Sequence, residues 1–156
     1  VRRMVIDHDD ADDVVQDVFV KVWRNLEKFR EDSQLYTWLY RIATNECITF
    51  LNKKKQKQHV SLDEEDSSYL SSTLTASSYF NGDAAQIKLQ QALLKLPEKQ
   101  RLVFNMKYFE DLKYEEISEI VGTSVGALKA SYHLAVKKIE LFFRSHDSTF
   151  SKRFTL

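Results

Sequence analysis

The sequence predicts an all-α protein made of two small helical domains, and three observations favour this architecture. Only three glycines and one proline occur among 156 residues, so few positions force a helix to break. Apolar residues recur every three or four positions in both halves of the chain, which is the period of a helix packed on one side. An acidic stretch rich in serine and threonine, without sustained periodicity, lies between the halves.

Charge is distributed unevenly along the chain, although Lys+Arg and Asp+Glu both number 23. Residues 58–83 carry a net charge of −5, whereas the residues before them carry +1 and those after them carry +4. We therefore expect domains at 1–57 and 84–145, joined by a flexible acidic linker at 58–83 and followed by a tail at 146–156. A mobile loop inside a single domain is the alternative interpretation of the acidic segment.

The composition offers little for catalysis or for a cofactor. Cys47 is the only cysteine, which excludes an intramolecular disulfide and suits a reducing, cytoplasmic setting. The four histidines are far apart, and no phosphate loop, nucleophile elbow or metal motif occurs. No apolar run reaches the roughly 18 residues of a membrane span. We expect no enzyme activity, no metal, no cofactor and no membrane span.

The first domain should begin with a helix over residues 10–29, "DADDVVQDVFVKVWRNLEKF", whose acidic first turn suits the helix dipole. Its expected inward stripe is Val15, Val18, Val22, Leu26 and Phe29. Val14, Val20 and Trp23 lie outside this stripe, so the apolar surface is wider than one packing face needs. The surplus fits either a helix at the centre of a bundle or a second face for a protein partner.

A second helix is predicted after the turn "REDS", with Ser33 as its N-cap. One side should pack through Leu35, Trp38, Leu39, Ile42, Ala43 and Phe50. The opposite side carries Thr37, Tyr40, Arg41, Thr44, Asn45, Ile48 and Asn52, and leads to Lys53, Lys54, Lys55 and Lys57. Aromatic rings and guanidinium groups stack on unpaired bases, and lysines neutralise phosphates. A solvated helix face with a basic end is the plainer alternative.

The second domain should open with a helix that ends near Leu96, because Pro97 suits the first turn of the following helix. The apolar stripe of the first of these helices is Ile87, Leu89, Ala92, Leu93 and Leu96. The stripe of the second is Leu102, Val103, Met106 and Phe109.

The segment "YEEISEIVGTSVGALKASYHLAVKKI" predicts a helix-turn-helix that breaks at Gly122, with Thr123 or Ser124 capping the second helix. The buried stripe of that helix is Val125, Leu128, Tyr132, Ala135, Ile139 and Phe142. Its outer side is Gly126, Ala130, His133 and Lys137, with Ala127 and Lys129 beside them. Small residues permit close approach to a DNA groove, and the lysines and serines can contact phosphates. An ordinary helical hairpin is the alternative.

Two segments, taken together, resemble the bacterial extracytoplasmic-function sigma factors of the sigma-70 family. The stretch "FREDSQLYTWLYRIATN" is similar to part of their region 2. The stretch "LPEKQRLVF…YEEISEIVGTSVGALK" is similar to part of their region 4. The order of the two regions and the acidic linker between them also match the family.

The resemblance implies a promoter-specificity subunit that binds RNA polymerase core, reads the minus-ten and minus-thirty-five promoter elements and assists DNA opening. The implied polymerase contacts are the clamp helices of the largest subunit and the flap. The residues implied to meet the clamp helices are Asp13, Gln16, Asp17 and Val20. An anti-sigma partner is common in the family.

The resemblance also implies two DNA-binding sets. The minus-ten set is Phe29, Arg30, Ser33, Tyr36, Tyr40, Arg41, Asn45, Lys53 and Lys54. The minus-thirty-five set is Ser124, Gly126, Ala127, Lys129, Ala130, Ser131, His133 and Lys137. In the linker, the acidic residues Asp63, Glu64, Glu65 and Asp66 suit a segment that mimics nucleic acid in the polymerase cleft.

Two features of the sequence depart from the family pattern, and two alternative functions are left undecided by the sequence. Many relatives carry arginine where this chain has Ser131 and Val136, which weakens the expected minus-thirty-five contacts. The opening "VRRMVI" looks like the end of a helix, so we expect the first domain to lack its opening helix. A helix-turn-helix regulator that acts without polymerase, or a helical adaptor that binds only protein, is the alternative function.

Overall fold

The computed structural model describes residues 1–30, 34–58 and 84–146, and every regular element within these ranges is helical. The prediction of an all-α chain is therefore confirmed. The elements are α1 (Arg2–Val5), α2 (His8–Asn25), η1 (Leu26–Lys28), α3 (Leu35–Gln58), α5 (Ala84–Leu94), α6 (Glu98–Phe104), the π-helical turn η3 (Asn105–Phe109), α7 (Tyr114–Val121) and α8 (Val125–His146). None of the described helices is long and apolar enough to cross a membrane.

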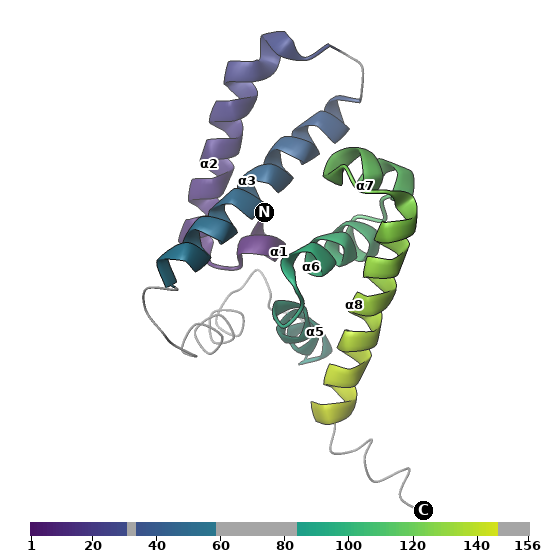
Figure 1. Cartoon of the computed structure of the whole chain (residues 1–156). Helices are drawn as coiled ribbons and strands as arrows, with labels where there is room; N and C mark the ends of the chain where they lie inside the picture. Colours follow the sequence, from purple (N-terminus) through teal and green to yellow (C-terminus); the bar gives the residue numbers. More distant parts are fainter. Residues whose placement is uncertain (31–33, 59–83, 147–156) are drawn as a thin grey trace, which may run out of the picture.

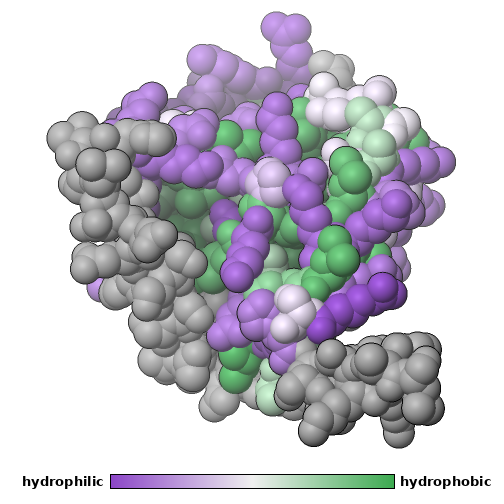
Figure 2. Space-filling view, turned by 60° about the horizontal axis from the view of Figure 1, so that its bottom comes forward, coloured by the Kyte–Doolittle hydropathy of each residue, from purple (hydrophilic) through white to green (hydrophobic). Residues whose placement is uncertain are grey.

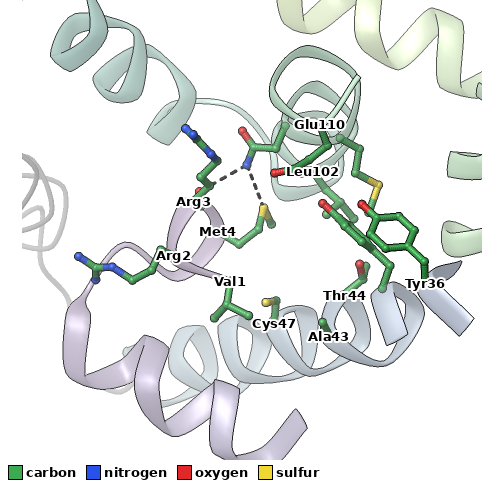
Figure 3. Close-up of a pocket in the computed structure, with 13 residues that line it drawn as sticks. Val1, Arg2, Arg3, Met4, Tyr36, Ala43, Thr44, Cys47, Leu102 and Glu110 are labelled. Atoms are coloured by element: carbon green, nitrogen blue, oxygen red, sulfur yellow. Dashed lines mark hydrogen bonds between the residues drawn. The ribbon is translucent and has the colours of Figure 1, made fainter. Parts of the chain in front are cut away.

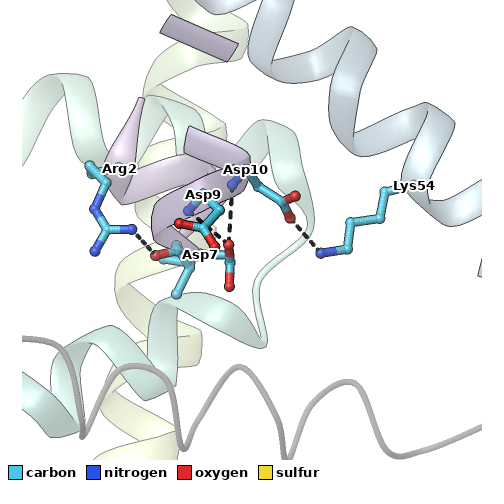
Figure 4. A network of polar contacts seen from close by, with 6 residues as sticks. Arg2, Asp7, Asp9, Asp10 and Lys54 are labelled. Carbon is cyan, nitrogen blue, oxygen red and sulfur yellow. Dashed lines mark hydrogen bonds and ion pairs between the residues drawn. The ribbon is translucent and has the colours of Figure 1, made fainter. Parts of the chain in front are cut away.

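Helix α2 begins two residues before its predicted start, because Asp7 acts as the N-cap. The Asp7 carboxylate accepts hydrogen bonds from the backbone N–H groups of Asp9 and Asp10 at 3.0 and 3.1 Å (Figure 4). These acceptors satisfy donors that the first helical turn leaves unpaired. The Asp10 carboxylate in turn pairs with the Lys54 ammonium at 2.8 Å, which joins the start of α2 to the end of α3.

The predicted inward stripe of α2 is partly wrong. The fully buried residues are Ala11 and Val14, whereas Leu26 is 49% exposed and lies in the 3₁₀ turn after the helix. Val14 was expected outside the stripe, but it belongs to a buried cluster with Met4, Val5 and Cys47, since α2 packs on both α1 and α3. An apolar stripe that assumes one neighbouring helix omits residues that a second neighbouring helix buries.

Helix α3 also has two covered sides, contrary to the prediction of one. It lies between α2 and α7 (Figure 1), and its most buried residues are Thr37, Thr44 and Cys47. The two threonines belong to the side expected to face outward, whereas Leu35 is 49% exposed. The sequence pattern reflected packing on α2 and gave no sign of α7, which lies more than 50 residues further along the chain.

The second half follows its predicted pattern closely. Pro97 precedes α6 and stands at its N-cap position, and the buried apolar residues of α5, α6 and η3 lie at the predicted positions, except that Phe104 is also buried. Helix α7 ends at Gly122, whose φ of 70° is a left-handed conformation that costs glycine little. Ser124 rather than Thr123 caps α8, since its hydroxyl accepts from the Ala127 N–H at 3.3 Å.

The two halves share one hydrophobic core. Met4, Val5, Ala11, Val14 and Cys47 from the first half lie in the same buried cluster as residues of α6, η3, α7 and α8. The members of this shared core from the second half are Leu102, Val103, Met106, Leu112, Ile117, Ile120 and Leu128. A second cluster, built from α5, α6 and α8, belongs to the second half alone. The two predicted domains therefore pack against each other.

Candidate nucleic-acid and protein interfaces

The outer surface of α2 combines acidic and aromatic side chains in solvent. Asp13, Gln16, Asp17 and Val20, the four residues implied to meet polymerase, are all exposed. Two large aromatics stand beside them, Phe19 at 69% and Trp23 at 80% exposure. Exposed aromatic surface of this kind is typical of protein contact sites. Phe19 was missed from the sequence, although its position between Asp17 and Val20 on the same helix was a usable signal.

The start of the predicted minus-ten face is held by an aromatic contact. The rings of Phe29 and Trp38 lie 5.2 Å apart, so the segment after η1 is tied back onto α3. Phe29 is half-buried by this contact, and Arg30 beside it is exposed. Ser33, the expected cap of α3 and a member of the minus-ten set, lies outside the described residues.

The middle of that face is partly engaged by the second half of the chain: Tyr40 is half-buried, whereas Tyr36 is 48% exposed and Arg41 is exposed. The Arg41 guanidinium donates a hydrogen bond to the backbone carbonyl of Glu119 on α7. The rings of Tyr36 and Tyr40 lie 5.4 Å apart, and Tyr40 packs against the shared core. Burial raises the pKa of Tyr40, and the nearby Glu110 carboxylate raises it further. Both tyrosines line a cavity of about 330 Å³ with Glu110, Asn105 and residues of α1 (Figure 3).

The far end of the minus-ten face is open. Asn45 and Lys53 are exposed on α3, and Lys54 is half-buried in its ion pair with Asp10. The nine members of the predicted set therefore divide into five exposed residues, three half-buried ones (Phe29, Tyr40 and Lys54) and Ser33, which is not described.

Helix α8, which the sequence predicts to read DNA, presents its predicted outer side to solvent. Ser124, Gly126, Ala127, Lys129, Ala130, His133 and Lys137 are exposed, and Ser131 is partly so. A Cβ atom built on Gly126 would meet nothing within 4 Å, so no contact inside the chain requires glycine there. Val136 packs on the second core, so it does not share the outer side with Ser131. The helix offers a shallow surface with basic groups at Lys129 and Lys137, which suits close approach to DNA.

An apolar groove runs along the other side of α8. It encloses about 470 Å³ between α5, α6 and α8, and its lining includes Leu89, Phe104, Tyr108, Val136 and Phe143. Figure 2 shows hydrophobic side chains exposed between hydrophilic ones on one face of the molecule. Tyr108 is 56% exposed at this groove. None of the residues that line this groove was predicted from the sequence to form a binding site.

No metal centre is visible in the parts of the chain that the structure describes, since no three His, Cys, Asp or Glu side chains there are grouped to hold an ion. The acidic residues proposed for the linker, Asp63, Glu64, Glu65 and Asp66, lie outside the described residues. The described surfaces carry aromatic faces, carboxylates, guanidinium and ammonium groups.

Comparisons with known proteins match both halves. The family models of Sigma-70 region 2 and Sigma-70, region 4 match residues 1–57 and 86–139. The chain is 33% identical over 138 residues to the ECF RNA polymerase sigma factor SigW of Bacillus subtilis, a match covering 84% of this chain and 74% of SigW. It is 31% identical over 138 residues to the ECF RNA polymerase sigma-E factor of Escherichia coli, covering 84% and 72%.

A solved structure has the same fold. It is the sigma factor RpoE in complex with the anti-sigma factor NepR from Bartonella quintana, with a TM-score of 0.70 and 22% sequence identity. The match covers 93% of this chain and 88% of that one.

Proposed function

The chain belongs to the extracytoplasmic-function sigma factors of the sigma-70 family, and from this we propose that it divides transcription initiation among three surfaces. As a member of that family it is an initiation factor that binds RNA polymerase core and directs it to promoters. Its place of action is the bacterial cytoplasm, where its polymerase works. The observation that best supports this proposal is that one chain combines an exposed acidic and aromatic side of α2 with an exposed recognition helix.

The first surface, on α2, binds polymerase. We assign Asp13, Gln16, Asp17 and Val20 to the clamp helices, and Phe19 and Trp23 extend this set. Trp23 supplies the largest exposed apolar area on the helix, and interface energy concentrates in a few such aromatic residues. The carboxylates around it give the contact its charge and orientation.

The second surface, on α3, captures unpaired bases of the minus-ten element. Tyr36 and Tyr40 offer rings for stacking, Asn45 an amide for a base edge, and Arg30, Arg41, Lys53 and Lys54 positive charge. Extruding a base costs a few kcal/mol. Stacking on an aromatic ring contributes about 1–3 kcal/mol per base, which offsets that cost.

The third surface, on α8, enters the major groove at the minus-thirty-five element. Exposed small residues at Gly126, Ala127 and Ala130 let the helix backbone approach the base edges, while Lys129 and Lys137 contact phosphates. On the opposite side of α8, the apolar groove suits the polymerase flap, whose binding would add a second polymerase contact. By similarity to the RpoE–NepR complex, an anti-sigma protein is a further partner.

Reconstituted transcription tests the proposal. Core RNA polymerase and this chain, given a randomised promoter library, should yield run-off transcripts from a defined sequence class. Trp23→Ala should weaken core binding about tenfold or more, because an interface aromatic contributes on the order of 2 kcal/mol. Leu141→Ala is the matched control, since Leu141 is 63% exposed on α8, away from the proposed clamp contact.

Three results would reject the proposal in different ways. Absence of core binding at moderate salt would leave an adaptor for another protein. Tight binding to duplex DNA without polymerase would favour a helix-turn-helix regulator. Equal loss of core binding in Trp23→Ala and Leu141→Ala would remove α2 as the polymerase surface.

A further inference from the structure

A cavity of about 330 Å³ lies where the two halves of the chain meet, and the three proposed surfaces do not account for it (Figure 3). Its wall comes from α1, α3, α6 and η3, and from Glu110, the first residue after η3. Pockets that hold small molecules enclose about 300–1,000 Å³, so this cavity is large enough for a compact ligand.

Much of the cavity wall is apolar. Met4, Cys47 and Met106 line it and are each at most 6% exposed. Burial raises the pKa of the Cys47 thiol, so this group stays uncharged at neutral pH. Ala43 on α3 also lines the cavity, and its side chain ends at Cβ, which leaves space beside it. This part of the wall suits the hydrocarbon body of a ligand.

Asn105 brings an unsatisfied hydrogen-bond acceptor to the cavity. Its side chain is 6% exposed, and its amide nitrogen donates to the Arg3 carbonyl at 3.4 Å and to the Met4 sulfur at 3.5 Å. A carbonyl oxygen can only accept, so the amide nitrogen must face Arg3 and the amide oxygen must face away from it. That oxygen, Oδ1, has no hydrogen-bond partner among the described residues. A buried acceptor without a donor is costly, and an N–H group of a ligand would satisfy it.

Glu110 supplies a carboxylate at the cavity, next to two tyrosine rings. Among the described residues, no ion pair holds this carboxylate. Burial raises the pKa of Tyr36 and of Tyr40, and Glu110 raises both further, so its charge lies near both hydroxyl groups. The two rings lie 5.4 Å apart. A carboxylate beside aromatic rings is a favourable environment for an ammonium group.

The two arginines that line the cavity direct their charge elsewhere. The Arg3 guanidinium lies 3.8 Å from the centre of the Phe109 ring, and the Arg2 guanidinium donates to the Ile6 carbonyl. Figure 3 shows both guanidinium groups turned away from Tyr36. An anionic ligand would therefore meet the carboxylate without gaining a guanidinium partner, so the cavity favours a cation.

We propose that this cavity binds a small primary amine with an apolar body, such as an aralkylamine. The ammonium group donates to Asn105 Oδ1 and pairs with the Glu110 carboxylate, and the rings of Tyr36 and Tyr40 lie beside it. A primary ammonium has three N–H donors, so it can serve both acceptors at once. The site goes beyond the proposed function, because binding of the amine needs neither polymerase nor DNA.

Phenethylamine is the probe, and two analogues share its ring and spacer. Phenethyl alcohol keeps a donor but has no charge, and phenethyltrimethylammonium keeps the charge but has no N–H donor. Calorimetric titration of the full chain should show saturable binding of phenethylamine with a Kd of about 1 mM or lower. Both analogues should bind at least about fivefold more weakly, because each loses one of the two interactions.

Amide chemical shifts measured by NMR locate the bound probe. Phenethylamine should shift the signals of Thr44, Cys47 and Asn105, which line the cavity from both halves. It should shift the signals of Leu89 and Phe143, which line the apolar groove, much less. Larger shifts at the groove would overturn the assignment of the site.

Two carboxylate variants test the charge of the site. Glu110→Gln removes a charge at an exposed position and should weaken phenethylamine binding about three- to tenfold. Glu140→Gln is the matched control, because it removes an exposed carboxylate that lines the apolar groove, and it should leave the affinity unchanged. Equal effects of the two variants, or equal affinity for phenethylamine and phenethyl alcohol, overturn the proposal.

A bulkier side chain tests the space. Ala43→Leu fills part of the cavity and should weaken binding at least about tenfold, whereas Ala127→Leu adds the same bulk on the exposed side of α8 and should not. Unchanged binding in a folded Ala43→Leu chain overturns the proposal, and if that chain does not fold, the carboxylate variants decide. These titrations contain no polymerase or DNA, so a chain that binds the amine but does not support transcription refutes only the proposed function.

Discussion

The recognition helix α8 and the minus-ten face of α3 are the two proposed DNA-binding surfaces, and the fold treats them differently. The outer side of α8 is exposed from Ser124 to Lys137. The centre of the α3 face carries the Arg41–Glu119 hydrogen bond and the buried side chains of Thr37 and Thr44. The outer side of α8 is largely free of contacts with the rest of the chain, whereas the α3 face is partly engaged by its own chain.

The difference follows from the residues that each helix places outward. Gly126, Ala127 and Ala130 offer little apolar area, so nothing in the chain gains by covering them. Tyr36 and Tyr40 have large rings, and an aromatic ring buries much apolar surface wherever a partner is available. The side chains that make α3 suitable for stacking on bases also make it a good packing surface for α7. A binding face rich in aromatics is therefore easily occupied by its own protein.

The contrast between the two surfaces depends on the two halves folding as one unit. A substitution in the shared core tests this and should have the largest effect. Met106→Ala removes a side chain that is 1% exposed in the shared core. Such a truncation costs about 2–5 kcal/mol of unfolding free energy. Both tryptophans, Trp23 and Trp38, lie in the first half, so their fluorescence in urea reports on that half. We expect their transition to shift although the substitution is in the second half.

Leu93→Ala gives the matched comparison, because Leu93 is equally buried but belongs to the second core alone. It should shift the tryptophan transition less than Met106→Ala if coupling runs through the shared core. A tryptophan transition that does not move in Met106→Ala would mean that the halves unfold independently, and the covering of α3 by α7 would then be weak.

The sequence predicted the exposed surface of α8 better than the partly buried face of α3. The helix-turn-helix was predicted nearly to the residue, including the break at Gly122 and a cap at Thr123 or Ser124, since its signals are local. The burial of Thr37 and Thr44 was missed, because it depends on α7, which is distant in sequence. Phe19 was missed because helical periodicity identifies the residues that a helix buries, not the large residues that it leaves exposed. Local rules found the open surface, and only the packed structure revealed the covered one.

The open and covered parts of the minus-ten face should respond differently to alanine. Tyr40→Ala removes a ring that both packs on the shared core and is proposed to stack on a base, so promoter opening and unfolding free energy should both fall. Asn45→Ala removes an exposed amide, so opening should fall while stability stays within about 0.5 kcal/mol. A loss of about 1–3 kcal/mol in base contacts corresponds to roughly five- to 150-fold in opening. Permanganate footprinting of the open complex and urea unfolding measure the two effects.

Core binding supplies the control for both variants. If Tyr40→Ala or Asn45→Ala weakens binding to core polymerase as much as promoter opening, the residue is structural and not a DNA contact.

The open surface of α8 should show a smaller, electrostatic effect. Lys129→Ala and Lys137→Ala each remove one proposed phosphate contact, so each should weaken promoter binding by the polymerase complex a few-fold at moderate salt. Each should also reduce the slope of log affinity against log salt by about 1. Lys99→Ala, an exposed lysine at the start of α6, is the control and should leave the slope unchanged. Equal slopes in all three variants would place α8 away from the DNA backbone.

The smallest expected effect concerns pH and tests whether the covered tyrosine is coupled to folding. Burial raises the pKa of Tyr40 above its usual value near 10, and the Glu110 carboxylate, Tyr36 and Cys47 add to this, while Arg3 opposes it. Above pH 10 the unfolded chain loses the tyrosine proton but the folded chain keeps it, so the folded state binds more protons and stability falls as pH rises.

Tyr40→Phe removes this proton and should make the stability loss between pH 10 and 11 shallower, while stability at pH 8 changes little. The urea midpoint measured by circular dichroism at these three pH values provides the test, and comparison with the wild type cancels the titration of the lysines. Tyr108→Phe is the matched control, since Tyr108 is 56% exposed and outside the α3–α7 contact. If Tyr40→Phe and Tyr108→Phe lose stability with the same slope as the wild type, Tyr40 titrates in solvent and α7 does not cover it.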